Sequence, residues 1–169
     1  MTTRVVLIGP ECAGKTTLAG ELAAAFDAPW TPEASRLYAE SSLAPLSATT
    51  VEPIARLSMR LEDDLRADHP PLIIRDTDLV STVVYARHYY GAAPEWIARE
   101  ARARRADLYL LCHPDLPWFP DGVRDRPRHR LALLADFRNE LNAMEARIVE
   151  IRGTGDIRRR AAHDAVAAL

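Results

Sequence analysis

The chain has 169 residues, 48% of them hydrophobic and 27% charged, and its formal net charge at pH 7 is −2. This length and composition predict one soluble domain with a sizeable core, and the near-neutral charge argues against nucleic acid as a partner. Two cysteines without metal-type spacing argue against a disulfide framework, and no apolar run is long enough to cross a membrane. We therefore expect a cytoplasmic protein with no membrane partner, and its oligomeric state is left open.

The first predicted element is a short apolar, β-branched strand at residues 4–8, which leads into a glycine-rich segment at residues 9–17. This segment matches G-x-x-x-x-G-K-[ST], the phosphate-binding loop of nucleoside-triphosphate enzymes. Apolar residues at helical spacing follow it and predict a helix from Lys15 to about Phe26. Strand, turn and helix start together predict a site for ATP.

The chemistry expected of this loop follows from its backbone and its single lysine. Glycines allow backbone conformations that bring the loop N–H groups and the helix N-terminus onto phosphate oxygens. We expect Lys15 to reach the β- and γ-phosphates and the Thr16 hydroxyl to bind Mg²⁺. Lys15 is the only lysine among the 22 basic residues, and for Cys12 a small filler role is favoured over a redox switch. The predicted ATP-binding residues of the loop are Gly9, Glu11, Cys12, Ala13, Gly14, Lys15, Thr16 and Thr17.

A short second strand is predicted within residues 28–33, ending near Glu33 at the carboxyl edge of the sheet. Glu33 and Arg36 would then face the ligand cleft. The alternative, weighted equally, is that Glu33 is an acid at a helix N-terminus, where it interacts with the helix dipole.

Residues 43–50 are expected to form a loop, and Thr49 or Thr50 to cap the helix that follows. The apolar stripe of this helix is predicted to be Ile54, Leu57, Leu61 and Leu65. Its charged residues are most simply a solvated face, and they are Arg56, Arg60, Glu62, Asp63 and Asp64.

The strand at residues 72–76 is predicted to deliver carboxylates to the same edge as the phosphate loop. Asp76 ends the strand and is the better candidate for holding Mg²⁺. Asp78 begins the next helix, at residues 79–90, and is either the weaker candidate for this edge or the N-cap of that helix. The aromatic residues of this helix, Tyr85 to Tyr90, either pack in the core or line a pocket for an aromatic ring.

A further helix is predicted from Pro94, and a buried strand at residues 107–112 opens into an unusual segment at residues 113–130. Four prolines and four arginines in this segment indicate a long functional loop, which we expect to be a lid over the phosphoryl group. A merely polar connection is the alternative. A helix at about residues 131–144, a strand at residues 147–151 and a terminal helix capped by Thr154 or Asp156 complete the chain.

The alternation of five strands with helices predicts an α/β fold, a P-loop NTPase with a five-stranded parallel sheet flanked by helices. Its motifs occur in order as the phosphate loop, Pro32-Glu33-x-x-Arg36, Asp76-Thr77-Asp78, and Pro117-Trp118 with Asp121-Gly122-x-Arg124. In this order they resemble the ribosylnicotinamide kinase domain of the bacterial NadR proteins over nearly the whole chain.

The resemblance implies a nucleoside-monophosphate-kinase-like fold with a lid, and transfer of the ATP γ-phosphate to the 5′-hydroxyl of nicotinamide riboside. ATP, Mg²⁺ and a small nucleoside are then the expected cofactors and partner. The implied catalytic residues are Lys15, Glu33, Asp76 and Arg124, with Thr16 and Asp76 on the metal and Arg128 on the nucleotide. The residues implied on the riboside side are Trp30, Glu33, Arg36, Asp78 and Trp118.

Full NadR-family proteins also carry an adenylyltransferase domain, and this sequence has no H-x-G-H motif for adenylyl transfer. We therefore expect residues 1–169 to form a stand-alone kinase domain with a lid at about residues 113–130. A regulatory GTPase is excluded because Asn-Lys-x-Asp is absent, and a mechanical AAA-type ATPase is set aside for lack of an extra helical domain. Another nucleoside or metabolite kinase and a non-catalytic ATP-binding protein stay open, as does the choice of Glu33 or Asp76 as the base.

Overall fold

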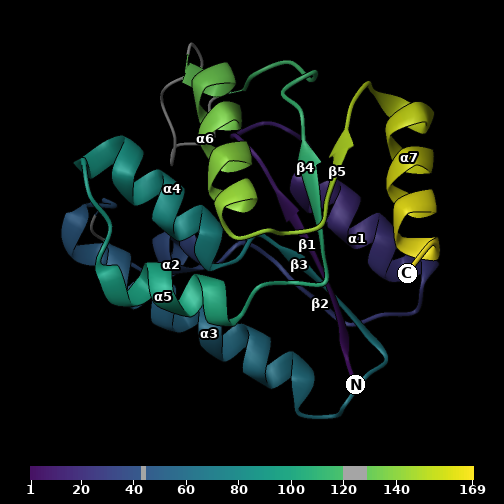
Figure 1. Ribbon diagram of the computed structural model, residues 1–169, viewed down its shortest axis with the longest axis horizontal. Helices are drawn as coiled ribbons and strands as arrows, with labels where there is room; N and C mark the ends of the chain where they lie inside the picture. The colour runs from purple at the N-terminus through teal and green to yellow at the C-terminus, as the bar shows by residue number, and fades with distance from the viewer. Residues whose placement is uncertain (43–44, 120–128) are drawn as a thin grey trace.

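A computed structural model of the chain describes residues 1–42, 45–119 and 129–169. Its centre is a sheet of five parallel strands in the order β2-β3-β1-β4-β5 (Figure 1). The strands are β1 (Thr3–Ile8), β2 (Trp30–Thr31), β3 (Leu72–Asp76), β4 (Leu108–Cys112) and β5 (Ile148–Ile151). The predicted five-stranded parallel sheet is confirmed, with a second strand that ends at Thr31 rather than Glu33.

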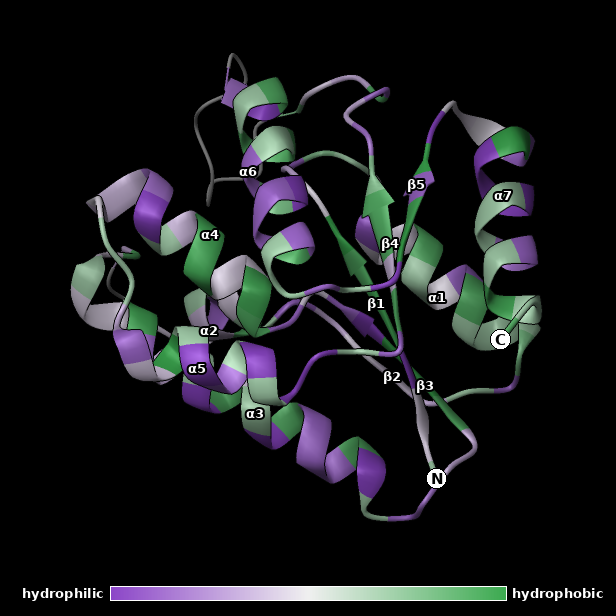
Figure 2. Cartoon of the chain, viewed as in Figure 1, coloured by the Kyte–Doolittle hydropathy of each residue, from purple (hydrophilic) through white to green (hydrophobic). Residues whose placement is uncertain are grey.

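Helices cover both faces of the sheet. They are α1 (Lys15–Ala25), α2 (Ala34–Ser41), α3 (Val51–Arg66), α4 (Leu79–Tyr90), α5 (Glu95–Ala103), α6 (Arg130–Ala143) and α7 (Gly155–Ala167), with a short 3₁₀ turn η1 (Ala48–Thr50) before α3. Helices α1 and α7 lie on one face, and α3, α4, α5 and α6 on the other (Figure 1). Because side chains alternate along a strand, Val5 and Leu7 of β1 face α1 while Val6 and Ile8 face α4. The apolar strands therefore lie between amphipathic helices (Figure 2).

The parallel register decides which functional residues meet. Leu7 of β1 lies opposite Asp76 of β3, so the chain leaves both strands at the same edge of the sheet. The phosphate-loop segment follows β1, and the Asp76-Thr77-Asp78 segment follows β3. The backbone N–H of Thr77 donates to the Leu7 carbonyl at 2.9 Å, which holds the two exits side by side.

One predicted surface is wrong. Glu62 of α3 is not on a solvated face: its side chain is 2% exposed and pairs with Arg75 of β3 at 3.0 Å. Ala55 and Ser58 are also buried, whereas Leu57, Leu61 and Leu65 are only half-buried. The helix is therefore rotated from the predicted stripe, because the buried Arg75 requires a counter-charge.

Candidate active site

The phosphate loop has the backbone that its sequence predicts. Gly9 has a φ of +142°, and a Cβ atom there would lie 2.4 Å from the Cys112 carbonyl oxygen. Gly14 has a φ of +71° and is the N-cap residue of α1. Side chains at these two positions would be strained or would clash, which explains why glycine occupies both. The helix N-terminus behind Gly14 provides the N–H groups and the dipole that attract phosphate.

Two of the three predicted ligand-binding residues of α1, Lys15 and Thr16, make side-chain contacts at this helix start. Lys15 is buried, and its Nζ donates to the Pro10 carbonyl oxygen at 2.7 Å across the loop. Thr16 Oγ1 donates to Asp76 Oδ2. Because Thr16 and Asp76 are 60 residues apart, this bond connects the phosphate loop to the end of β3.

Asp76 lies in conflicting electrostatic surroundings. Burial raises the pKa of its carboxyl, while Lys15, the Thr16 hydroxyl and Arg36 act in the opposite direction. Its Oδ1 is buried and has no hydrogen-bond partner among the described residues. A threonine hydroxyl beside one such carboxylate suits Mg²⁺, which commonly takes one or two protein oxygens and completes its shell with water and nucleotide phosphates. The residues present therefore fit the predicted metal.

Two segments that the motif does not include hold the loop in place. A Cβ atom at Gly14 would lie 2.7 Å from Leu116 Cδ1, and Cys12 Sγ lies 3.1 Å from the Phe119 carbonyl oxygen. Arg158 of α7 is buried and donates to the carbonyl oxygens of Ala13 and, at 3.2 Å, His113. Sequence reasoning missed Arg158, since it is one of three consecutive arginines in the terminal helix and only its burial distinguishes it.

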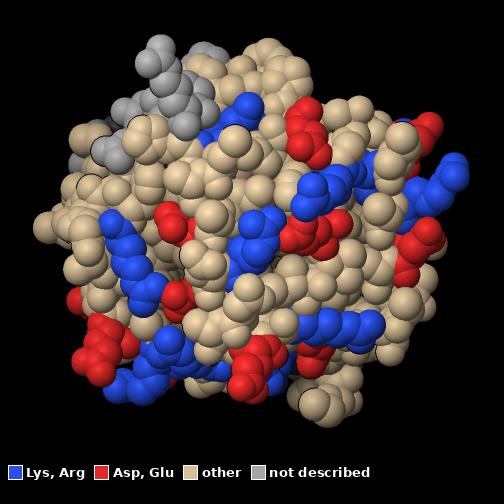
Figure 3. Space-filling view, turned by 45° about the horizontal axis from the view of Figure 1, so that its top comes forward, with Lys and Arg blue, Asp and Glu red and all other residues tan. Residues whose placement is uncertain are grey.

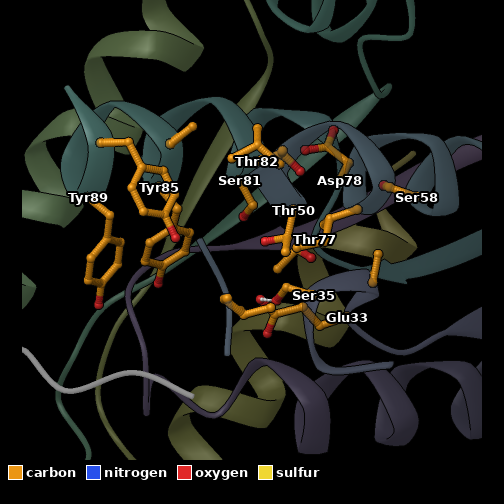
Figure 4. A pocket seen from close by; sticks show the side chains of 16 residues that line it. Glu33, Ser35, Thr50, Ser58, Thr77, Asp78, Ser81, Thr82, Tyr85 and Tyr89 are labelled. Atoms are coloured by element: carbon orange, nitrogen blue, oxygen red, sulfur yellow. Dashed lines mark hydrogen bonds between the residues drawn. The ribbon is translucent and has the colours of Figure 1, made fainter. Parts of the chain in front are cut away.

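A cavity of about 370 Å³ lies next to the Asp76-Thr77-Asp78 segment, with Thr77 and Asp78 in its wall (Figure 4). Its walls come from the start of α2, from α3, from Thr77-Asp78 and from the tyrosines of α4. Glu33 is buried and faces this cavity, and its Oε1 accepts a hydrogen bond from Ser35 Oγ at 2.6 Å. Glu33 is also the N-cap residue of α2, but its side chain makes no cap hydrogen bond. Its backbone therefore lies at the helix N-terminus, and its side chain lies in the cavity wall.

Asp78 is the N-cap residue of α4, which is one of its predicted roles. Its Oδ1 accepts from the Val80 N–H at 2.9 Å as the N-cap of α4, and its Oδ2 accepts from Tyr109 Oη at 2.8 Å. Burial raises the pKa of Asp78, and burial likewise raises the pKa of Tyr109. Asp78 also lines the cavity, so a structural residue contributes to the site.

The aromatic helix faces the cavity rather than only the core. Tyr85, Tyr89 and Tyr90 line it, and the rings of Tyr85 and Tyr89 lie 6.2 Å apart in a stacked arrangement (Figure 4). Of the two predicted roles for this segment, an aromatic pocket wall is therefore the one the geometry favours.

The structure brings most, but not all, of the predicted site residues together. Lys15, Thr16 and Asp76 converge at the phosphate loop, and the charge of Arg36 lowers the pKa of Asp76. Arg36, predicted on the riboside side, is not among the described residues that line the cavity. Trp30 is 36% exposed and its ring lies over Gly20 of α1, away from the cavity lining. Trp118 lies after β4, in the segment that touches the loop, and does not line the cavity. The predicted lid residues Arg124 and Arg128 lie outside the described residues.

Two further observations bear on partners. No helix in the described ranges is both long and apolar enough to cross a membrane. On the face shown in Figure 3, acidic and basic side chains are interspersed without a patch of one sign.

Comparisons with known proteins agree with the motif-based resemblance. A family model described as an AAA domain matches residues 4–160. The "Trifunctional NAD biosynthesis/regulator protein NadR" of Escherichia coli K12 is 28% identical over 124 residues, which cover 71% of this chain and 30% of NadR. The NadR of Salmonella typhimurium matches equally. The chain thus spans less than a third of these curated relatives.

Solved structures extend the match to the whole fold. A NadR protein in complex with NR superposes with a TM-score of 0.78 and 22% identity, covering 99% of this chain and 51% of that one. Thymidylate kinase from Ehrlichia chaffeensis superposes with a TM-score of 0.66 and 14% identity, covering 99% of this chain and 97% of that one. The predicted P-loop, nucleoside-monophosphate-kinase-like fold is confirmed.

Proposed function

Because the chain belongs to this AAA domain family, we propose that it is an ATP-dependent kinase that transfers the γ-phosphate to the 5′-hydroxyl of a nucleoside, most favourably nicotinamide riboside. One observation carries the proposal: the Asp76-Thr77-Asp78 segment joins the phosphate loop, through the bond from Thr16 to Asp76, to a cavity with the dimensions of a small ligand, which Thr77 and Asp78 line. Asp76 serves the loop and Asp78 lines the cavity, so a donor and an acceptor would meet there.

The lining of the cavity supports an acceptor without phosphate. No Lys, Arg or His is among the described residues that line it, whereas kinases that accept a nucleoside monophosphate must compensate the charge of its phosphate. Two buried acidic residues, Glu33 and Asp78, line the cavity instead, although both oxygens of Asp78 accept hydrogen bonds within the fold. This charge balance favours a neutral or cationic nucleoside.

The tyrosines support a cationic ring in particular. The faces of Tyr85, Tyr89 and Tyr90 present π-electron density, which attracts cations through the ring quadrupole. The nicotinamide ring of nicotinamide riboside is a positively charged pyridinium. Similarity to NadR, one structure of which is a complex with NR, supports the same choice.

In this scheme the chain supplies positioning and charge, which are the main contributions of proteins to phosphoryl transfer. Lys15 would bind the β- and γ-phosphates, and Thr16 and Asp76 would hold the Mg²⁺, which would neutralise charge on the phosphates. Glu33 or Asp76 orients the acceptor hydroxyl or accepts its proton. Arg124, with Arg128 or Arg130, stabilises the transferring group from a lid at residues 113–130, within the kinase domain proposed for residues 1–169.

The decisive experiment measures ADP production with Mg²⁺-ATP and a panel of acceptors. We expect a saturable response to nicotinamide riboside. Much weaker responses are expected to the uncharged nucleosides cytidine and uridine, and to the nucleotide thymidine monophosphate. The reduced riboside, whose ring is uncharged, is the matched control for the role of charge and should have a higher KM. A stronger response to another nucleoside would make that nucleoside the assigned acceptor. ATP binding without any acceptor-dependent production of ADP would favour a non-catalytic ATP-binding protein.

A further inference from the structure

The carboxylate of Glu11, in the phosphate loop, contacts a residue of the aromatic cavity wall. The side chain of Glu11 is 1% exposed, and its Oε2 lies 3.4 Å from Tyr85 Oη, which donates to it. Its Oε1 is buried and has no hydrogen-bond partner among the described residues. Burying a carboxylate with so few partners is costly, so its retention at this position requires an explanation.

The position of Glu11 offers one. Its backbone is part of the loop that surrounds the nucleotide phosphates, whereas the residue its side chain contacts, Tyr85, is part of the aromatic wall of the acceptor cavity. The two residues are 74 positions apart in the chain. We propose that the Glu11–Tyr85 contact couples the two sites, so that nucleotide in the loop and acceptor in the cavity bind cooperatively.

The physical basis is electrostatic. A triphosphate in the loop brings negative charge close to the Glu11 carboxylate, and in a site of low dielectric this repulsion is strong. A hydrogen bond from Tyr85 disperses the carboxylate charge and becomes more favourable when the phosphates arrive. The present contact of 3.4 Å is longer than the 2.7–2.8 Å typical of an O–H···O bond, and long contacts in catalytic sites often shorten once substrates bind.

A shorter contact would fix the Tyr85 ring. Tyr85 also stacks on Tyr89 and makes an edge contact with Phe137 of the core at 5.6 Å between ring centroids, so its orientation affects the shape of the wall. A ring held in place loses less conformational freedom when an acceptor stacks on it. By reciprocity, the acceptor must strengthen nucleotide binding by the same factor. Glu11 is thus a positioning residue that acts through Tyr85.

This inference rests on the proposed function, and binding titrations separate the two. The affinity of nicotinamide riboside would be measured with and without a non-hydrolysable ATP analogue and Mg²⁺. We expect the analogue to tighten riboside binding by about fivefold or more in the unmodified chain. Glu11→Gln and Tyr85→Phe should each reduce this coupling factor towards one, and the double variant should reduce it no further. Loss of affinity equal in both conditions would indicate a merely structural role.

Glu21→Gln is the matched control, because Glu21 lies on α1 and pairs with the exposed Arg159 at 3.5 Å. It should leave the coupling factor unchanged. If the unmodified chain shows acceptor-dependent ADP production but no coupling, or if both variants keep the coupling, the inference fails while the proposed function stands. If no acceptor supports ADP production, the proposed function fails first.

Discussion

Two neighbouring residues of β3, Arg75 and Asp76, lie in two different buried charge clusters, one within the core of the fold and one at the phosphate loop. Arg75 faces α3, where Nη1 contacts Glu62 at 3.0 Å and Nη2 donates to the Ser58 carbonyl oxygen at 2.8 Å. Asp76 faces α1, where one oxygen accepts from Thr16 and the other has no partner among the described residues. The charges of the first cluster are compensated within the fold, because Glu62 pairs with Arg75, although Glu62 Oε1 and Arg75 Nε also lack hydrogen-bond partners among the described residues. The second cluster differs because its unpartnered carboxylate oxygen lies at the end of β3, beside Thr16 of the phosphate loop.

This difference arises because successive residues of a strand point to opposite faces. Arg75 lies opposite Val6 in the register and joins the α3 side, and Asp76 lies opposite Leu7 and joins the α1 side. At the end of this one strand, Arg75 therefore bonds to α3, which forms part of the cavity wall, and Asp76 on the other face bonds to Thr16 at the predicted metal site. We infer that perturbing the first cluster costs mainly stability, and perturbing the second costs mainly activity.

The largest expected effect is on the structural cluster. Glu62→Ala leaves the Arg75 guanidinium buried without its closest counter-charge, and the free energy of unfolding should fall by about 3–5 kcal/mol. Urea unfolding followed by circular dichroism measures the change. Glu52→Ala is the control, since Glu52 is exposed and its pair with Arg56 contributes about 0.5 kcal/mol or less. If the free energy of unfolding fell equally in Glu62→Ala and Glu52→Ala, the structural role assigned to the Arg75–Glu62 cluster would be wrong.

The next effect is on the functional cluster. Lys15→Ala removes the only lysine and its charge at the phosphates, and the rate of acceptor-dependent ADP production should fall by about 10²–10³-fold. Circular dichroism would verify that the variant is folded. Turnover close to that of the unmodified chain in a folded variant would refute the role assigned to the loop.

Asp76→Asn should change activity and stability in opposite directions. Because burial raises the pKa of Asp76 in the folded chain, its ionised form destabilises the fold above that pKa. The amide should therefore lower activity yet raise the free energy of unfolding at pH 7–8, by about 1.4 kcal/mol for each pKa unit. The gain should disappear below the unfolded pKa of about 3.8, where both states are protonated. Reduced stability of the variant at pH 8 would contradict this account.

The smallest effect concerns Asp78, which contributes to both helix capping and the cavity. Tyr109→Phe removes the hydroxyl that donates to Asp78 Oδ2 and accepts from the Ala106 N–H. We expect a loss of about 1–2 kcal/mol in the free energy of unfolding. The KM for the acceptor should rise modestly while the KM for ATP stays constant, as steady-state kinetics can test. Equal changes in both KM values would argue against an acceptor-side position for Asp78.

The sequence by itself determined the phosphate loop, its strand and helix, the parallel sheet and the placement of Asp76 beside Thr16. These features depend on local backbone chemistry: glycines at positive φ, a β-branched strand, and a carboxylate at a strand end. The helix cap at Asp78 follows from an equally local rule and is confirmed.

The tertiary structure alone decided which charged side chains are buried. Glu62 and Arg158 lie on helices whose other charged residues are mostly exposed, and their burial depends on partners 13 to 145 residues away. The acceptor cavity is likewise assembled from four separate segments between residues 33 and 90. A sequence pattern records spacing along one helix or strand, whereas counter-charges and cavity walls are set by the packing of distant elements, so only the folded chain contains that information.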